Sequence, residues 1–402
     1  MPAATPLPRG PSILTLYDAA DLLTAPGCPV CRYWAEASDR YLRWFALEGH
    51  AQPDTITRLC SCLGACASHT RRLMSQPGAA VRMTALYRYV VTAARDRLAG
   101  RADRLTPCPA CDHDAAAAGR ALDTLLEGLA DAATMYRCRE LGGVCLPHLA
   151  AAATIARRQT VGWLVETMRN STEAGGAHLD WLAGNDPDAE TRAVLRRSMP
   201  ATGQATRAAC PLCLAGAEAE RDALDRLAGL ASDGPDPALT LCAGHLADAA
   251  AATGGQHSLR VLLAWQLECL TARLDAGQAH WLRARRLQQA AADSGCTVCR
   301  ARRDAAQRTL ATVSAACRLP AGSAMCIRHH VVLRVADPRA SRALAAAAAE
   351  AADVLIGELV DAFDSAARAR SHGAAAPDSG AWRRAAAFLD GAVFGGYPAR
   401  RM

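Results

Sequence analysis

The sequence contains no lysine, and asparagine, isoleucine and phenylalanine are scarce. All 45 basic residues are therefore arginine, which would suit phosphate recognition but is also the expected bias of a GC-rich genome. The formal net charge of +6 over 402 residues is modest. A dedicated nucleic-acid-binding domain concentrates more positive charge, so nucleic acid stays an alternative partner with little support.

Long apolar runs are missing as well. The most apolar stretch, residues 345–360, is interrupted by Glu350, Asp353 and Glu358, and no run reaches the roughly 18 to 20 residues of a membrane span. The N-terminus lacks the basic and then apolar segments of a secretory signal. We therefore expect a cytoplasmic protein with no membrane span. In that reducing compartment, the 17 cysteines favour metal thiolates over disulfides.

Aromatic residues make up only 4% of the chain, and the alternation of polar and apolar residues that marks strands is almost absent. Much of the 51% apolar content is alanine, the strongest helix former. Leu122, Leu125, Leu126 and Leu129 follow the i, i+3, i+4, i+7 spacing of one helix face. The sequence therefore predicts an essentially all-α fold.

Two short cysteine motifs alternate strictly along the chain, CxxC and then CxxH, four times. They supply sixteen candidate metal ligands: Cys28, Cys31, Cys66, His69, Cys108, Cys111, Cys145, His148, Cys210, Cys213, Cys242, His245, Cys296, Cys299, Cys326 and His329. One CxxC pair would be a weak signal, but four in constant order indicate metal binding. Self-similarity of this kind also indicates a repeat architecture.

The order of the motifs predicts four divergent helical repeats, each stapled by one Cys3His metal site. We place them at residues 1–100, 101–184, 185–290 and 291–372, followed by a C-terminal linker and short helix at 373–402. A helix of about 16 residues separates the two motifs of a repeat and spans roughly 24 Å. We expect a helical hairpin to leave the metal at CxxC and return to it at the CxxH of the same repeat.

Three thiolates and one imidazole complete the tetrahedral shell of a structural zinc ion and leave no position for a substrate. We therefore predict up to four Zn²⁺ ions per chain, with an iron–sulfur cluster as the less favoured alternative. Attachment of c-type haem is excluded, because no CxxC pair is followed directly by histidine. A helix that begins beside each motif would stabilise the thiolates through its dipole.

Five further cysteines lie outside these sets: Cys60, Cys62, Cys138, Cys269 and Cys317. Cys269 lies among leucines and is expected in a core. The others suit either packing at helix ends or a redox or alternative-ligand role, and Cys60 and Cys62 compete with Cys66 for the first metal. In the fourth repeat, His330 is an alternative to His329.

The segments GCPVCRYWAEASDRYLRWF, LGACASH, PCPACDHDAAAAGRALDTLL and GGVCLPHL resemble an uncharacterised bacterial family of CPxC, helix, GxCxxH repeats. The resemblance is closest over about the first 180 residues and continues through the metal motifs of the last two repeats. It implies metal-binding helical repeats. It implies no substrate, because the family is a domain of unknown function.

The sequence holds no GxSxG, P-loop, HExxH or GxGxxG element in a suitable setting. We therefore expect a scaffold or adaptor that binds protein partners rather than an enzyme. One alternative is a thiolate-based redox or metal sensor or carrier, which the extra cysteines would serve. Another is an enzyme or maturation factor of a bacterial biosynthetic pathway, with a site hidden between repeats.

Overall fold

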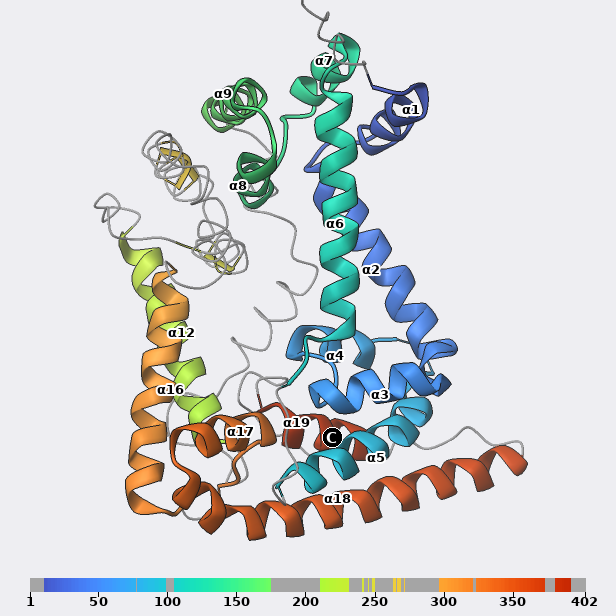
Figure 1. The fold of residues 1–402 in the computed structure, drawn as a ribbon, viewed down its shortest axis with the longest axis vertical. Helices are drawn as coiled ribbons and strands as arrows, with labels where there is room; N and C mark the ends of the chain where they lie inside the picture. Colours follow the sequence, from blue (N-terminus) through green and yellow to red (C-terminus); the bar gives the residue numbers. More distant parts are fainter. Residues whose placement is uncertain are drawn as a thin grey trace, which may run out of the picture. The chain divides into compact units, whose positions relative to one another are not determined.

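A computed structural model describes residues 11–76, 78–98, 105–174, 210–230, 296–320, 323–372 and 380–391, with a few single positions between 241 and 271. All regular secondary structure in these segments is helical (Figure 1), which confirms the all-α prediction. Within the same segments, no helix combines the length and apolarity that crossing a membrane requires.

The helices mostly follow the breaks that proline and glycine make in the sequence. Their bounds are α1 Ile13–Leu22, α2 Pro29–Leu47, the 3-10 turn η1 Gly49–Ala51, α3 Pro53–Cys62, α4 Ala67–Met74, α5 Ala79–Leu98, α6 Pro109–Gly128, α7 Ala132–Glu140, α8 Leu146–Ile155, α9 Arg158–Ala174, α12 Pro211–Leu230, α16 Thr297–Ala316, α17 Ile327–Ala336, α18 Pro338–Ser371 and α19 Ala381–Leu389.

The chain forms two compact units, each built from segments that are distant in sequence. Unit A contains residues 1–37, 115–189 and 224–297, and unit B contains residues 38–114, 190–223 and 298–402. Helices α2, α6 and α12 each begin in one unit and end in the other. Neither unit is a run of whole predicted repeats, and the repeat boundaries themselves stay a prediction.

The core of unit A joins helices from the first two predicted repeats. Val30 of α2, Leu125 of α6, Leu149 of α8 and Leu164 of α9 belong to one cluster, and each is 0% exposed. Burying a leucine side chain stabilises the fold by about 1.5–3 kcal/mol. The first turn of α2 is thereby held beside the CxxH motif at the start of α8.

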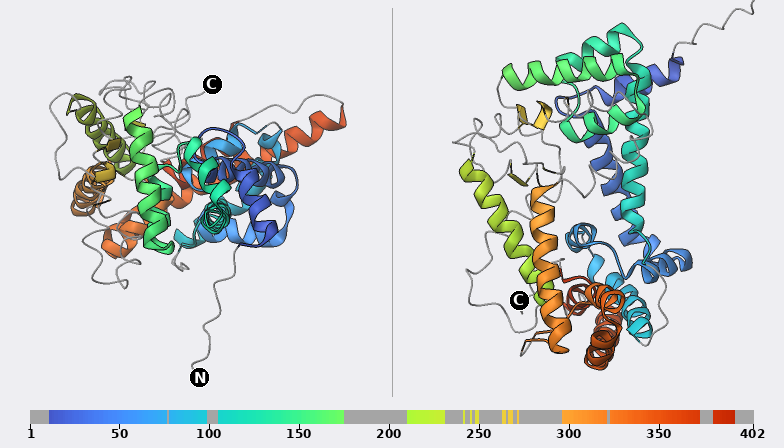
Figure 2. Two further views of the ribbon diagram at one scale, coloured as in Figure 1. Left: turned by 90° about the horizontal axis from the view of Figure 1, so that it is seen from above. Right: turned by 60° about the vertical axis from the view of Figure 1, so that its left-hand side comes forward.

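The core of unit B joins the first predicted repeat to the last. Helix α5 packs along the 34-residue helix α18 (Figure 2). Val90 of α5, Leu359 of α18 and Trp382 of α19 lie in the same cluster and are 0–1% exposed. The sequence predicted a short closing helix near Trp382, and α19 confirms it as part of this core.

Candidate metal centres

Each described ligand motif stands at the start of a helix. Cys66, Cys145 and Cys326 are the N-caps of α4, α8 and α17, with extended backbone near φ −65° to −70° and ψ 154° to 165°. The CxxC motifs behave alike: the carbonyl of Cys28 accepts a hydrogen bond of 3.1 Å from the N–H of Arg32 in the first turn of α2. The positive end of each helix dipole therefore favours the thiolate form of these cysteines.

Proline and glycine in the motifs set this geometry. Pro29 and Pro109 occupy the first position of α2 and α6, where the missing N–H of proline has no partner to lose. Gly64 and Gly143 both have φ of +86°, a conformation that favours glycine. Their N–H groups donate to carbonyls five residues earlier at 2.8 Å, which ends α3 and α7 and turns the chain into the next CxxH.

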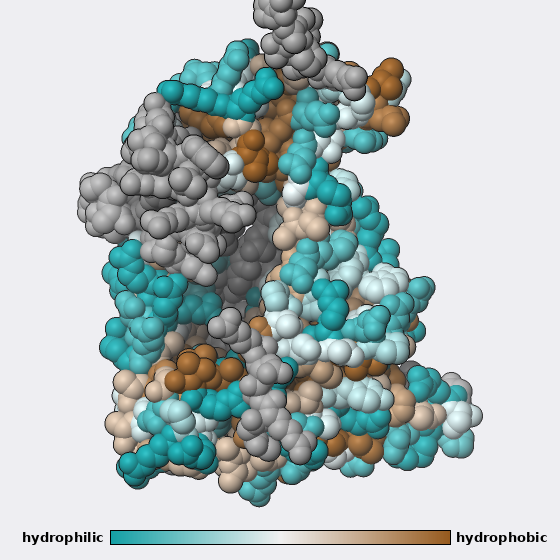
Figure 3. All heavy atoms as spheres, viewed as in Figure 1, coloured by the Kyte–Doolittle hydropathy of each residue, from teal (hydrophilic) through white to brown (hydrophobic). Residues whose placement is uncertain are grey.

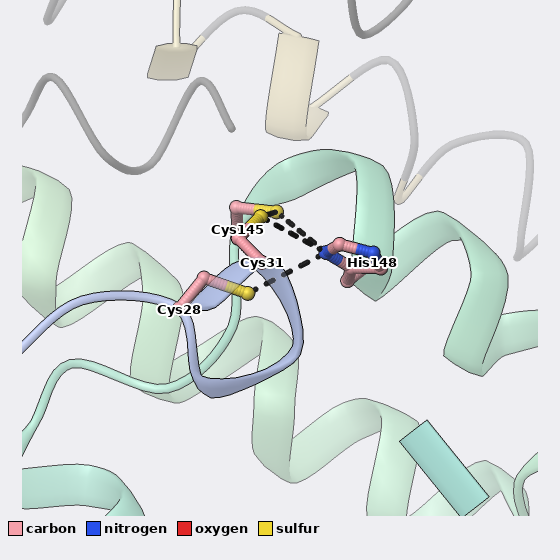
Figure 4. A group of neighbouring side chains, drawn as sticks. All are labelled: Cys28, Cys31, Cys145 and His148. Atoms are coloured by element: carbon pink, nitrogen blue, oxygen red, sulfur yellow. Dashed lines mark hydrogen bonds between the residues drawn. The ribbon is translucent and has the colours of Figure 1, made fainter. Parts of the chain in front are cut away.

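The first candidate metal site brings together Cys28, Cys31, Cys145 and His148 (Figure 4). His148 Nδ1 lies 3.5, 3.3 and 3.1 Å from the sulfurs of Cys28, Cys31 and Cys145, and the sulfurs of Cys31 and Cys145 are 3.5 Å apart. The three cysteines are buried. Burial lowers the pKa of His148, but its contacts with Cys28 and Cys31 raise that pKa by more. The net result is a pKa of about 10, above the usual value of histidine. The site therefore favours a cation.

The second site contains Cys66, His69, Cys108 and Cys111. His69 Nδ1 lies 3.1, 3.8 and 3.5 Å from the sulfurs of Cys66, Cys108 and Cys111, and those of Cys66 and Cys111 are 3.6 Å apart. Hydrogen bonds from the thiols of Cys111 and Cys66 lower the pKa of Cys108. This site also lies on two helix starts, those of α4 and α6.

Asp114 supports the second site from outside the ligand set. Its Oδ2 lies 2.8 Å from His69 Nε2, and the two side chains are only 10% and 7% exposed. Burial lowers the pKa of His69, but Asp114 and the nearby cysteines raise it overall, to about 11. A carboxylate on the second nitrogen orients a ligating imidazole and increases its basicity. Asp114 is not among the predicted site residues, because none of the other CxxC motifs has an acidic residue three positions after its second cysteine.

The third site contains Cys210, Cys213, Cys326 and His329. His329 Nδ1 lies 3.4, 3.3 and 3.2 Å from the sulfurs of Cys210, Cys213 and Cys326. His330, the alternative ligand, is buried and lines a different small cavity with Arg97 and Ser341. His329, and not His330, therefore belongs to this group of side chains.

The fourth group contains His245, Cys296 and Cys299. His245 Nδ1 lies 3.3 Å from the sulfur of Cys296, and both residues are buried. The predicted fourth ligand, Cys242, lies outside the described residues. The described members of this group nevertheless follow the same pattern as the other three.

The predicted partners within a repeat are wrong. We expected Cys28 and Cys31 to share a metal with Cys66 and His69, but the CxxC of the first repeat meets the CxxH of the second, and the CxxC of the second meets the CxxH of the first. The last two repeats exchange their motifs in the same way. The sites of both pairs are therefore reciprocal.

Helix lengths explain the exchange. Helix α2 has 19 residues and spans about 28 Å, at 1.5 Å per residue, whereas α3 has 10 residues and spans about 15 Å. Helices α6 and α7, with 20 and 9 residues, repeat this inequality. In the first two repeats the second helix is thus only about half as long as the first, so the expected hairpin does not bring CxxH back to its own CxxC.

The protein was compared with protein-family models, curated proteins and solved structures, and nothing matches in any of the three comparisons. The resemblance to bacterial CPxC…GxCxxH repeats therefore stays a prediction. What the metal centres do has to be argued from their own geometry.

The cysteines outside the ligand sets differ in their surroundings. Cys62 and Cys138 are buried, and burial is the main reason why the pKa of each thiol is raised to about 12. Burial also raises the pKa of Cys60. Cys66, not Cys60 or Cys62, belongs to the second site. The predicted core position of Cys269 lies outside the described residues.

Proposed function

We propose that this protein is a zinc-stapled helical scaffold whose metal ions fix the arrangement of its helices, and that it binds protein partners. One observation carries the proposal: three cysteines and one histidine, from two separate motifs, meet where two helices begin. Three such sets are complete within the described residues. No part of the proposal depends on an activity of a related protein.

Ligand distances support a single tetrahedral zinc ion at each site. With Zn–S near 2.3 Å and Zn–N near 2.0–2.1 Å, tetrahedral geometry separates two sulfurs by about 3.8 Å and a sulfur from a nitrogen by about 3.5 Å. The sulfur pairs lie 3.5, 3.6 and 3.8 Å apart. In an iron–sulfur cluster the ligands are divided among two or more irons, so some of them lie farther apart than the 4.8 Å within which all ligand atoms of each set lie here. The geometry thus favours one ion over a cluster.

A closed ligand set favours a structural role. Four protein ligands leave no position for water or substrate, whereas catalytic zinc keeps one open. A structural zinc contributes about 10–16 kcal/mol of apparent binding free energy, more than the roughly 5–15 kcal/mol net stability of a typical protein. Zinc would therefore decide whether the N-terminus of α2 stays beside that of α8, and the N-terminus of α4 beside that of α6.

An exposed apolar surface on α1 supports a protein partner. Ile13, Leu14 and Tyr17 are 69%, 71% and 67% exposed, and the hydrophobic surface at the upper right of Figure 3 lies over this helix. Leu16 and Arg137 help to line an open cleft of about 510 Å³ between α1 and α7. Grouped apolar side chains of this kind are typical of surfaces that bind other proteins.

The redox alternative finds little support in the extra thiols. Reactive cysteines are accessible and have a lowered pKa, whereas Cys62 and Cys138 are buried and have a raised one. A role as metal carrier would use the candidate metal sites.

The zinc assignment is tested by elemental analysis and X-ray absorption of protein purified without added metal. We expect close to four zinc ions per chain and an average shell of three sulfurs and one nitrogen. Iron with visible cluster absorbance, or fewer than three zinc ions, would contradict the assignment.

The scaffold role is tested by affinity capture with the full-length protein as bait. We compare the zinc-loaded protein, the chelator-treated protein and the variant Leu14→Glu, which places a charge on the exposed face of α1. A partner that binds the zinc-loaded bait and is lost with the other two would support the role. Equal recovery on all three baits would contradict it.

A further inference from the structure

The two residues that follow α19, Asp390 and Gly391, touch the third candidate metal site. Gly391, two residues after α19, is buried, and a Cβ at this position would lie only 2.8 Å from the sulfur of Cys213 and 3.3 Å from Cβ of Cys210. Because real Cβ atoms do not approach so closely, the backbone fits here only without a side chain. A residue far from every ligand motif in sequence thus lies against two of the site's cysteines.

Gly391 also donates through its backbone to the remaining thiol. A backbone hydrogen bond joins Gly391 to the sulfur of Cys326. Gly391 therefore lies against all three cysteines of the third site.

The neighbouring residue is tied to the same motif. Asp390 Oδ2 lies 3.0 Å from Arg328 Nε, and Arg328 lies between Cys326 and His329 in the CxxH. The Asp390 carboxylate is only 14% exposed, so solvent screens this ion pair less than a surface pair. Arg328 also donates to the carbonyl of Cys62 at 3.2 Å, which ties the motif to the end of α3.

Helix α19 anchors these two residues in unit B. Trp382 and Leu389 are each 1% exposed, and the ring of Trp382 lies 5.8 Å from that of Tyr87. On the outer side, Arg384 pairs with Glu358 of α18 at 2.9 Å. The position of Gly391 is therefore fixed by a packed helix that ends two residues before it.

We propose that Asp390 and Gly391 form a lid over the third metal site, and that docking of α19 controls release of the metal ion from it. The proposal rests on the proposed function, since it assumes a bound zinc ion. An acceptor ligand removes zinc by replacing a thiolate, without any change of oxidation state. The backbone of Gly391 blocks that approach at Cys210 and Cys213.

Release of zinc to a coloured chelator tests the lid in the full-length, zinc-loaded protein. Gly391→Ala forces the backbone away from Cys213, so one zinc ion per chain should leave about 10- to 100-fold faster, the usual range for loss of a contact to a ligand. Gly357→Ala is the matched control, because a Cβ there meets nothing within 4 Å. It should release zinc like the wild type.

A second experiment, in the variant Cys210→Ser, shows which site releases the faster zinc ion. In Cys210→Ser, which lacks a ligand of the third site, Gly391→Ala should accelerate no further release. If Gly391→Ala does not fold, Leu389→Ala, which loosens the packing of α19 that fixes the position of Gly391, should act in the same direction. Release at the wild-type rate from the folded variants, or an effect that persists in Cys210→Ser, would overturn the lid. Wild-type protein that binds no zinc would instead overturn the proposed function.

Discussion

Replacing Asp114 should weaken one metal site and leave the others unchanged. His69 Nε2 and Asp114 Oδ2 are 2.8 Å apart, and both side chains are nearly buried. Loss of such a partner typically lowers metal affinity 10- to 100-fold, which corresponds to about 1.4–2.8 kcal/mol. Asp114→Asn keeps an oxygen for the His69 N–H and removes only the charge, so we expect about tenfold. Asp114→Ala leaves that N–H without this acceptor, so we expect about 100-fold.

Asp112, two residues before Asp114, provides a matched control. Asp112 also follows Cys111, but its carboxylate points to Arg58 at 3.2 Å, and both side chains are more than half exposed. Exposed pairs of this kind contribute little to stability. Asp112→Asn should therefore leave the affinity of every site within twofold of the wild type.

Competition with a coloured chelator measures these affinities. The zinc ions at the other sites serve as internal standards, and Cys108→Ser identifies the second site by removing one of its ligands. One zinc ion should shift in Asp114→Asn, and the same ion should be missing in Cys108→Ser. Equal titrations for Asp114→Asn and Asp112→Asn, or a shift spread over all the sites, would refute the role of Asp114.

Three further predictions concern stability and reactivity. Leu125→Ala, at a position that is 0% exposed in the core of unit A, should lower the free energy of unfolding by about 2–5 kcal/mol in urea; a loss below 1 kcal/mol would contradict the core. Gly143→Ala, at φ +86°, should lower the stability measured by thermal unfolding by about 1–2 kcal/mol. Gly119→Ala, on an open helix face, should instead raise it by about 0.5–1 kcal/mol, and equal effects of the two variants would argue against the turn. Burial raises the pKa of Cys62 and Cys138 to about 12, so both thiols should stay protonated at pH 8 and react with iodoacetamide only after denaturation. Modification in the folded protein as fast as that of a free thiol would contradict their burial.

The sequence contained the positions of the metal motifs and the helices that follow them. The helical spacing of Leu122, Leu125 and Leu129 predicted the face of α6 that lies in the core of unit A. Proline after the first cysteine and glycine before CxxH marked where helices begin and end. These features are local, so they can be recognised without knowing the fold.

The partners of the motifs could not be predicted in the same way, because pairing depends on distance through space. Helix lengths were the available signal: the break at Gly49 and Pro53 and the turn at Gly64 limit α3 to 10 residues, too few to retrace α2. Asp114 and Gly391 carried no signal at all. Each supports a site through a contact that only the folded chain creates.

Counting the metal ions in combined variants tests the reciprocal sites most directly. The variant Cys28→Ser with Cys31→Ser should hold one zinc ion fewer than the wild type. Adding Cys145→Ser and His148→Ala should remove no further ion, since all four residues serve one site, whereas adding Cys66→Ser and His69→Ala should remove a second. The opposite result, a second ion lost with Cys145 and His148 and none with Cys66 and His69, would show that each repeat binds its own metal and would contradict the account.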